Sequence, residues 1–180
     1  KREAGQLINA APTFQYRCII KMFVQTGIRR FELMDLDVRD IDFERRFIHI
    51  RNGKGGKERT VIASPDLITD LKHLLHKRKT GPVFMSNRNK CFGIRSLNRI
   101  VADVGKLAGI KNPDPQATYI GCHTLRHTFA RLWKDSGRSI ESLSKILGHT
   151  SVAMTHDEYG TESMEMVKAN YDAVMETIPE

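Results

Sequence analysis

The sequence predicts an α+β domain that is mainly α-helical, with one small antiparallel three-stranded sheet. Apolar residues recur at helical spacing through most of the chain, whereas residues 38–62 contain short apolar runs between turn-forming residues. Glycines and prolines separate these segments where helices are expected to end. With 180 residues, 40% of them hydrophobic, the chain has the size of a single domain.

Three helices are expected in the N-terminal part of the chain. Helical spacing of apolar residues predicts helices over residues 3–11 and 13–25, and Gly27 is expected to end the second of them. A further short helix is expected over residues 30–36.

The sheet is expected within residues 38–62, because short apolar runs alternate there with turn-forming residues. Residues 53–57, with the sequence GKGGK, are expected to form its tight, exposed and basic hairpin.

Two helices separated by a loop are expected in the middle of the chain. Ser64 is a suitable N-cap and Pro65 a suitable first residue for a helix that ends near Lys79. Ser96 is expected to cap the next helix, which Gly109 closes. Residues 81–93 and 111–121 are expected to be loops.

The last third of the chain is expected to be helical. The same spacing and capping criteria predict helices over residues 124–136, 140–147, 152–158 and 163–177. Gly137 and Gly148 supply the breaks.

The charge of the chain favours a partner made of phosphates. Lysine and arginine total 29 against 21 aspartate and glutamate, which gives a formal net charge of +8 and a pI near 9.6. This indication is weak by itself, because a basic surface also keeps a protein soluble.

The cysteines and the ends of the chain indicate where the protein resides. The three cysteines form no CxxC pair, so neither a disulfide framework nor a zinc ribbon is expected. No apolar run approaches the ~20 residues needed to cross a bilayer, and no signal peptide is recognised, so a cytoplasmic protein is expected.

Because the chain starts at Lys1 without a methionine, we expect residues 1–180 to be one catalytic domain cut from a longer protein.

Six polar residues at the ends of expected elements are candidates for chemistry: Arg29, Lys54, His123, Arg126, His149 and Tyr159. Each has an ordinary structural explanation. An arginine after a glycine is usually a solvated charge, an arginine beside an apolar stripe can snorkel, and a histidine beside a helix end can be a cap or a core residue. Together they form a complete set for phosphoryl transfer without a metal ion.

The motifs around these residues resemble those of a known family. They are TGIRRFEL at residues 26–33, KGGKERTV at 54–61, HTLRHTFA at 123–130, LGHTSVAMT at 147–155, and Tyr159. In order and spacing they resemble the catalytic domain of the tyrosine recombinases, also called phage integrases. The resemblance runs from about Leu7 to the tail, and it implies the fold of that catalytic domain.

The resemblance implies a role for each candidate. Arg29 and Arg126 would hold the non-bridging oxygens of the scissile phosphate, and His123 and His149 would add donors. Either histidine is a candidate to take the proton of Tyr159, the nucleophile. Lys54 would be the general acid for the leaving 5′-oxygen, with Lys57 as its competitor.

Three further features of the sequence bear on the resemblance: Glu32, the other tyrosines and the residues after Tyr159. Glu32 looks like the acidic residue that the family places after its first arginine, and it is expected to position neighbours through hydrogen bonds. The other tyrosines, Tyr16, Tyr119 and Tyr171, do not follow the LGH motif at the family's distance. The histidine often found just beyond the nucleophile is absent, with Gly160 and Thr161 in its place.

A site-specific recombinase that works through a covalent 3′-phosphotyrosyl intermediate is therefore the expected function. The alternatives are a DNA-relaxing enzyme of the type IB topoisomerase kind, a catalytically inactive DNA-binding accessory protein, and a solute-binding or structural protein whose basicity is incidental. The resemblance implies double-stranded DNA as partner, an upstream core-binding domain, a tetramer on two DNA sites and a monomer without DNA. It implies no cofactor and no metal ion. The tail helix is expected to dock either on its own core or on a neighbouring protomer.

Overall fold

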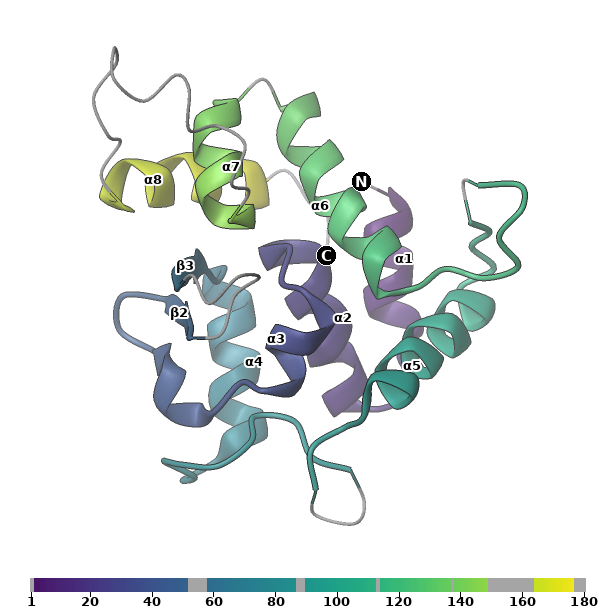
Figure 1. The fold of residues 1–180 in the computed structure, drawn as a ribbon, viewed down its shortest axis with the longest axis horizontal. Helices are drawn as coiled ribbons and strands as arrows, with labels where there is room; N and C mark the ends of the chain where they lie inside the picture. The colour runs from purple at the N-terminus through teal and green to yellow at the C-terminus, as the bar shows by residue number, and fades with distance from the viewer. Residues whose placement is uncertain are drawn as a thin grey trace.

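A computed structural model of the chain describes residues 2–51, 58–86, 90–112, 114–136, 138–148 and 164–176. In these ranges the domain is mostly helical and contains a three-stranded antiparallel sheet, which confirms the predicted fold class (Figure 1). No helix among the described residues is both long and apolar enough to span a bilayer.

Helix α2 (Phe14–Thr26) is the central element of the core. Every residue from Cys18 to Thr26 is buried, because α1 (Arg2–Ala10), α4 (Pro65–Leu75) and α6 (Cys122–Asp135) pack around it. The hydroxyl of Thr13 caps its start by accepting from the amide of Tyr16 at 3.1 Å. Gly27 ends the helix in the left-handed conformation, as predicted.

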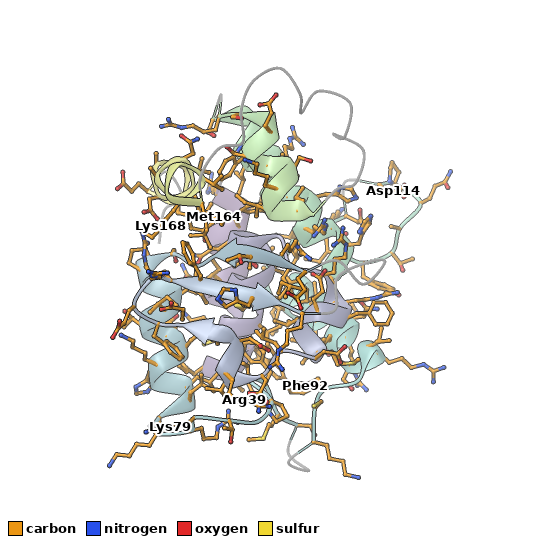
Figure 2. The ribbon with its side chains drawn as sticks, turned by 60° about the vertical axis from the view of Figure 1, so that its left-hand side comes forward. Arg39, Lys79, Phe92, Asp114, Met164 and Lys168 are labelled. Atoms are coloured by element: carbon orange, nitrogen blue, oxygen red, sulfur yellow. The ribbon has the colours of Figure 1, made fainter. Side chains whose placement is uncertain are left out.

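The sheet follows α3 (Arg30–Met34) and the short 3-10 turn η1 (Val38–Asp40). Its strands β1 (Ile41–Asp42), β2 (Phe47–Ile50) and β3 (Arg59–Ile62) lie in that order, with Ile48 of β2 opposite both Ile41 and Val61. In Figure 2 the strands face the viewer between α8, which carries Met164 and Lys168, and the segment around Arg39 and Lys79. The predicted hairpin turn at residues 53–57 lies outside the described residues.

Two predicted helix boundaries in the middle of the chain are wrong. Helix α4 ends at Leu75 and not near Lys79, because His76 adopts a positive φ of 50° and stops the helix. Arg78 then donates to the carbonyls of Pro82 and Val83, which holds the chain in a turn. The next helix, α5 (Ile94–Leu107), is preceded by Gly93 as its cap, so Ser96 lies inside its first turn and is not the cap.

The described C-terminal helices lie where they were predicted, with starts that differ by at most two residues. Helix α6 begins at Cys122, so His123 lies in its first turn and not before it. Helix α7 (Ile140–Leu147) has the predicted bounds, with Ser139 as its cap and Gly148 after it. The helix predicted over residues 152–158 lies outside the described residues.

Helix α8 (Met164–Met175) packs on its own chain. The ring of Tyr171 is fully buried, with its centroid 6.5 Å from that of Phe129. Asp172 accepts from the guanidinium of Arg46 at 2.5 Å. Of the two docking modes expected for the tail helix, the structure therefore shows the one on its own core.

Candidate catalytic site

Arg29 is positioned by a tight turn after α2. Gly27 has a φ of +63°, and a Cβ atom there would lie 2.6 Å from the ring of Phe129 and 2.7 Å from the side chain of Leu147. Only glycine fits this close approach between α2, α6 and α7. The turn places Arg29 immediately before the first residue of α3, with its side chain 24% exposed.

Arg126 points into the protein from α6. Its side chain is buried, at 7% exposure, and its guanidinium donates to the carbonyl of Gly27 and, at 2.8 Å, to that of Leu147. The alternative in which Arg126 merely snorkels to solvent is therefore wrong. The residue joins the ends of α2 and α7.

Glu32 is the carboxylate of the site. It accepts from the backbone amide of Arg29 at 2.7 Å and from its guanidinium at 3.0 Å. It also accepts two bonds from Arg59, one of them at 2.7 Å. The expectation that Glu32 positions neighbours through hydrogen bonds agrees with these contacts.

Arg59 is a member of the site that the sequence analysis missed. It is the first residue of β3, its side chain is only 7% exposed, and its Nε donates to the carbonyl of Ile146 at 2.9 Å. It lies within the KGGKERTV motif, but beside Lys57 and Glu58 it looks like one more solvated charge. The sequence contains no signal for its long-range pairing with Glu32.

The three arginines converge on the end of α7. We call Arg29, Arg59, Arg126 and Glu32 the arginine cluster. Three consecutive carbonyls each accept from a different arginine: that of Ile146 from Arg59, that of Leu147 from Arg126 and that of Gly148 from Arg29. Carbonyls at a helix C-terminus have no partners within the helix and carry its partial negative charge, so they suit such donors.

The arginine cluster carries more positive than negative charge, since it contains three guanidinium groups and one carboxylate, which pairs with Arg29 and Arg59. Burial, together with the nearby charges of Arg29 and Arg59, lowers the pKa of Arg126 to about 10 against the opposing effect of Glu32. Burial tends to raise the pKa of Glu32, but the hydrogen bond and charge of Arg59 and the bonds from Arg29 outweigh it and lower that pKa. Arg126 and Glu32 are therefore both ionised at neutral pH, and the net positive charge of the cluster favours binding of an anion.

His123 is exposed at the start of α6, and its Nε2 lies 2.7 Å from Nε2 of His127, one turn further along. Partial burial lowers its pKa, as do His127, Arg126 and Arg30. His123 is therefore mostly neutral at pH 7. Both histidines line a cavity of about 720 Å³, beside Thr124 and Leu132.

The other predicted site residues cannot be placed. Lys54, its competitor Lys57, His149 and Tyr159 lie outside the described residues. The structure thus brings Arg29 and Arg126 together, with Glu32, and places His123 on the helix that carries Arg126.

The remaining described tyrosines differ in accessibility. Burial raises the pKa of Tyr171 well above its usual range, with Asp172 adding to the shift and Arg46 opposing it. A buried neutral phenol is a poor nucleophile. Tyr119 is 53% exposed in the loop before α6. Within the described ranges, no group of three or more metal-ligating side chains occurs.

The fold is that of a catalytic domain of the tyrosine recombinases and integrases. The crystal structure of XerA recombinase is similar with a TM-score of 0.73 and 28% identity, over 98% of this chain and 59% of that one. The pre-cleavage complex of XerH site-specific recombinase bound to difH substrate matches with a TM-score of 0.70 and 23% identity, over 94% of this chain and 52% of that one.

Sequence comparison gives the same family. Tyrosine recombinase XerA of Pyrococcus furiosus is 33% identical over 162 residues, which is 86% of this chain and 54% of that protein. The sequence profile of the phage integrase family matches residues 1–166. The chain belongs to the phage integrase family, and it spans about half the length of this relative.

Proposed function

We propose that this chain is the catalytic part of a site-specific DNA recombinase that cuts and rejoins DNA through a 3′-phosphotyrosyl bond to Tyr159. The observation that carries the proposal is the arginine cluster, in which three guanidinium groups with one carboxylate meet at the end of α7. The likeness to a recombinase solved with a difH substrate supports DNA as the partner.

In this mechanism the arginines bind the scissile phosphate. Arg29 is the more exposed of the two predicted phosphate ligands, and Arg126 lies beneath it. A guanidinium presents parallel donors that match the non-bridging oxygens and stays protonated at any working pH. Because attack adds negative charge to the phosphorus centre, donors fixed in advance stabilise the transition state more than the bound substrate.

Tyr159 would attack in line after losing its proton. A free tyrosine has a pKa of ~10, so the surrounding positive charge must favour the phenolate. His123 is a candidate base because its lowered pKa leaves the imidazole neutral. His149, which follows Gly148 in the sequence, is the other candidate.

Lys54 would protonate the leaving 5′-oxygen. The phosphorus forms a bond to the phenol oxygen as its bond to the 5′-oxygen breaks, and the lysine proton passes to that oxygen. The phosphotyrosyl bond conserves the energy of the phosphodiester, so the 5′-hydroxyl of a second strand reverses the step without ATP. In this proposal no step uses a metal ion.

The whole reaction would join two duplexes. We propose that four copies assemble on two DNA sites, that the protein is monomeric without DNA, and that it acts in the cytoplasm on nucleoid or host-cell DNA. An upstream core-binding domain would bind each duplex from the opposite side.

Strand exchange between two cognate duplexes tests the proposal. The cognate site would first be enriched from a random duplex library by binding at moderate salt. We expect Holliday junctions from two such duplexes and none with Tyr159→Phe. Relaxation of any supercoiled plasmid without junctions would indicate a type IB topoisomerase activity, and binding without cleavage would indicate an accessory protein.

A further inference from the structure

We propose that Arg59 is a positioning residue for strand cleavage, which fixes Glu32 and the end of α7 and takes up part of the carboxylate charge that would otherwise neutralise Arg29. The inference rests on the proposed function and deepens it. In the sequence, Arg59 comes just after Glu58 and the segment 52–57, which contains Lys54.

The contacts of Arg59 show that it acts through other residues. Its Nε donates to Ile146, and both terminal nitrogens donate to Glu32. A guanidinium that already donates from all three nitrogens inside the protein is poorly placed to bind a phosphate as well.

Glu32 is the group through which Arg59 affects Arg29. Both oxygens of Glu32 accept from both arginines, Arg59 through its guanidinium and Arg29 through its guanidinium and backbone amide. Without Arg59, the whole carboxylate charge would act on Arg29 alone. Arg29 would then be better neutralised and a weaker ligand for the developing phosphorane charge.

The Arg59 side chain occupies space that the absence of a side chain at Gly148 leaves open. A Cβ atom on Gly148 would lie 2.5 Å from Cδ and 3.2 Å from Nε of Arg59. The side chain therefore lies directly against the backbone that leads to His149. Removal of the Arg59 side chain would take away this contact and the bond to the carbonyl of Ile146.

Arg51 offers a matched control. It lies at the other end of the same segment, just after β2, and pairs with Asp40 while its side chain is 51% exposed. Arg51→Gln removes the same charge as Arg59→Gln but touches neither Glu32 nor α7. A general loss of positive charge near DNA would affect both variants alike.

The test measures cleavage and binding separately. A cognate duplex with a nick near the cleavage site traps the covalent adduct in a single turnover, and fluorescence anisotropy of the intact duplex gives the Kd. We expect Arg59→Gln to slow adduct formation by about 100-fold, as small misplacements of catalytic groups do, with a Kd within about 3-fold. Arg59→Lys should recover only a small part of the rate, because an ammonium lacks the planar fork.

A combined variant covers the case in which Arg59→Gln is unstable. If Arg59 and Glu32 act as a unit, the rate of the Arg59→Gln, Glu32→Gln double variant should be no lower than that of the slower single variant. A wild-type rate for Arg59→Gln, equal losses for Arg51→Gln, or parallel losses in rate, Kd and thermal midpoint would each overturn the inference. Absence of any adduct with the wild-type protein would instead overturn the proposed function, and the inference with it.

Discussion

Two buried ionic clusters within the described residues have opposite excess charge. In the first, Lys21 of α2 is 2% exposed, and its ammonium lies 2.5 Å from Asp66 and 2.6 Å from Asp70 of α4. One cation thus faces two carboxylates. The arginine cluster contains three cations and one carboxylate, that of Glu32, which pairs with Arg29 and Arg59.

The two clusters differ in what stabilises their excess charge. The excess negative charge beside Lys21 reaches water, because the side chain of Asp66 is 43% exposed. The excess positive charge of the arginine cluster is met by backbone carbonyls, which carry only partial charges. The first cluster is therefore complete as a structural contact between α2 and α4, whereas the second still gains from binding an anion.

Arg126 should show the largest effect on catalysis. Arg126→Gln removes two donors and a charge from the arginine cluster, so adduct formation on the nicked duplex should slow by about 1,000-fold, in the range found for loss of oxyanion donors. Arg126→Lys should stay close to that rate, because it keeps the charge without the fork. A loss of less than tenfold in both variants would contradict the role of Arg126 as phosphate ligand.

Lys21 should show the largest effect on stability. Lys21→Met leaves Asp70, which is 16% exposed, beside an apolar side chain, and urea unfolding should show a loss of about 3 kcal/mol. Arg99→Gln breaks the exposed pair with Asp103 and should change stability by less than about 0.5 kcal/mol. The rate of cleavage per folded molecule should be unchanged in both variants. A selective loss of rate in Lys21→Met would contradict the claim that the Lys21 cluster is only a structural contact.

Gly148 should show a smaller, mixed effect. Gly148→Ala forces a side chain into a φ of +62° and against Arg59, so we expect about 1 to 2 kcal/mol of destabilisation and a slower rate of adduct formation. Gly109 has a similar φ of +68° but open space around its Cβ position. Gly109→Ala should therefore destabilise to a similar degree without slowing cleavage; equal rates in the two variants would refute the importance of the Arg59 contact.

The smallest expected effect is on the pH dependence of stability. Because the folded pKa of Glu32 lies below its ordinary value of 4.5, the wild type gains stability from this ionised group above about pH 4.5. That contribution disappears as the pH falls through the folded pKa. The stability difference between wild type and Glu32→Gln should thus shrink on acidification, which urea titrations at several pH values measure. A constant difference would mean that the Glu32 charge adds nothing to folding.

Helix ends were predicted correctly where a capping residue or a glycine in the sequence determines them. The bounds of α7 follow from the capping Ser139, whose hydroxyl accepts from Ser142, and from Gly148. The end of α4 was wrong because residues 77–79, Lys-Arg-Lys, are good helix formers. The positive φ of His76 and the bonds from Arg78 to the following loop decide that end.

The site was predictable only where its residues stand in a recognisable motif. Arg29 and Arg126 were found from their motifs, and the structure brings both to the end of α7. Arg59 was missed because its partners Glu32 and Ile146 are 27 and 87 positions away in the sequence. Such pairing depends on how the strand and helices pack, and a single sequence has no periodic pattern that indicates it.

Mapping the covalent link tests the central claim most directly. The protein would be incubated with the nicked cognate duplex, digested with protease, and the DNA-linked peptide identified by mass spectrometry. We expect the phosphate to be attached to Tyr159 in the wild type and the adduct to be nearly absent in Arg126→Gln. Attachment to Tyr16, Tyr119 or Tyr171, or an undiminished adduct in Arg126→Gln, would contradict the assignment of nucleophile and arginine cluster to one site.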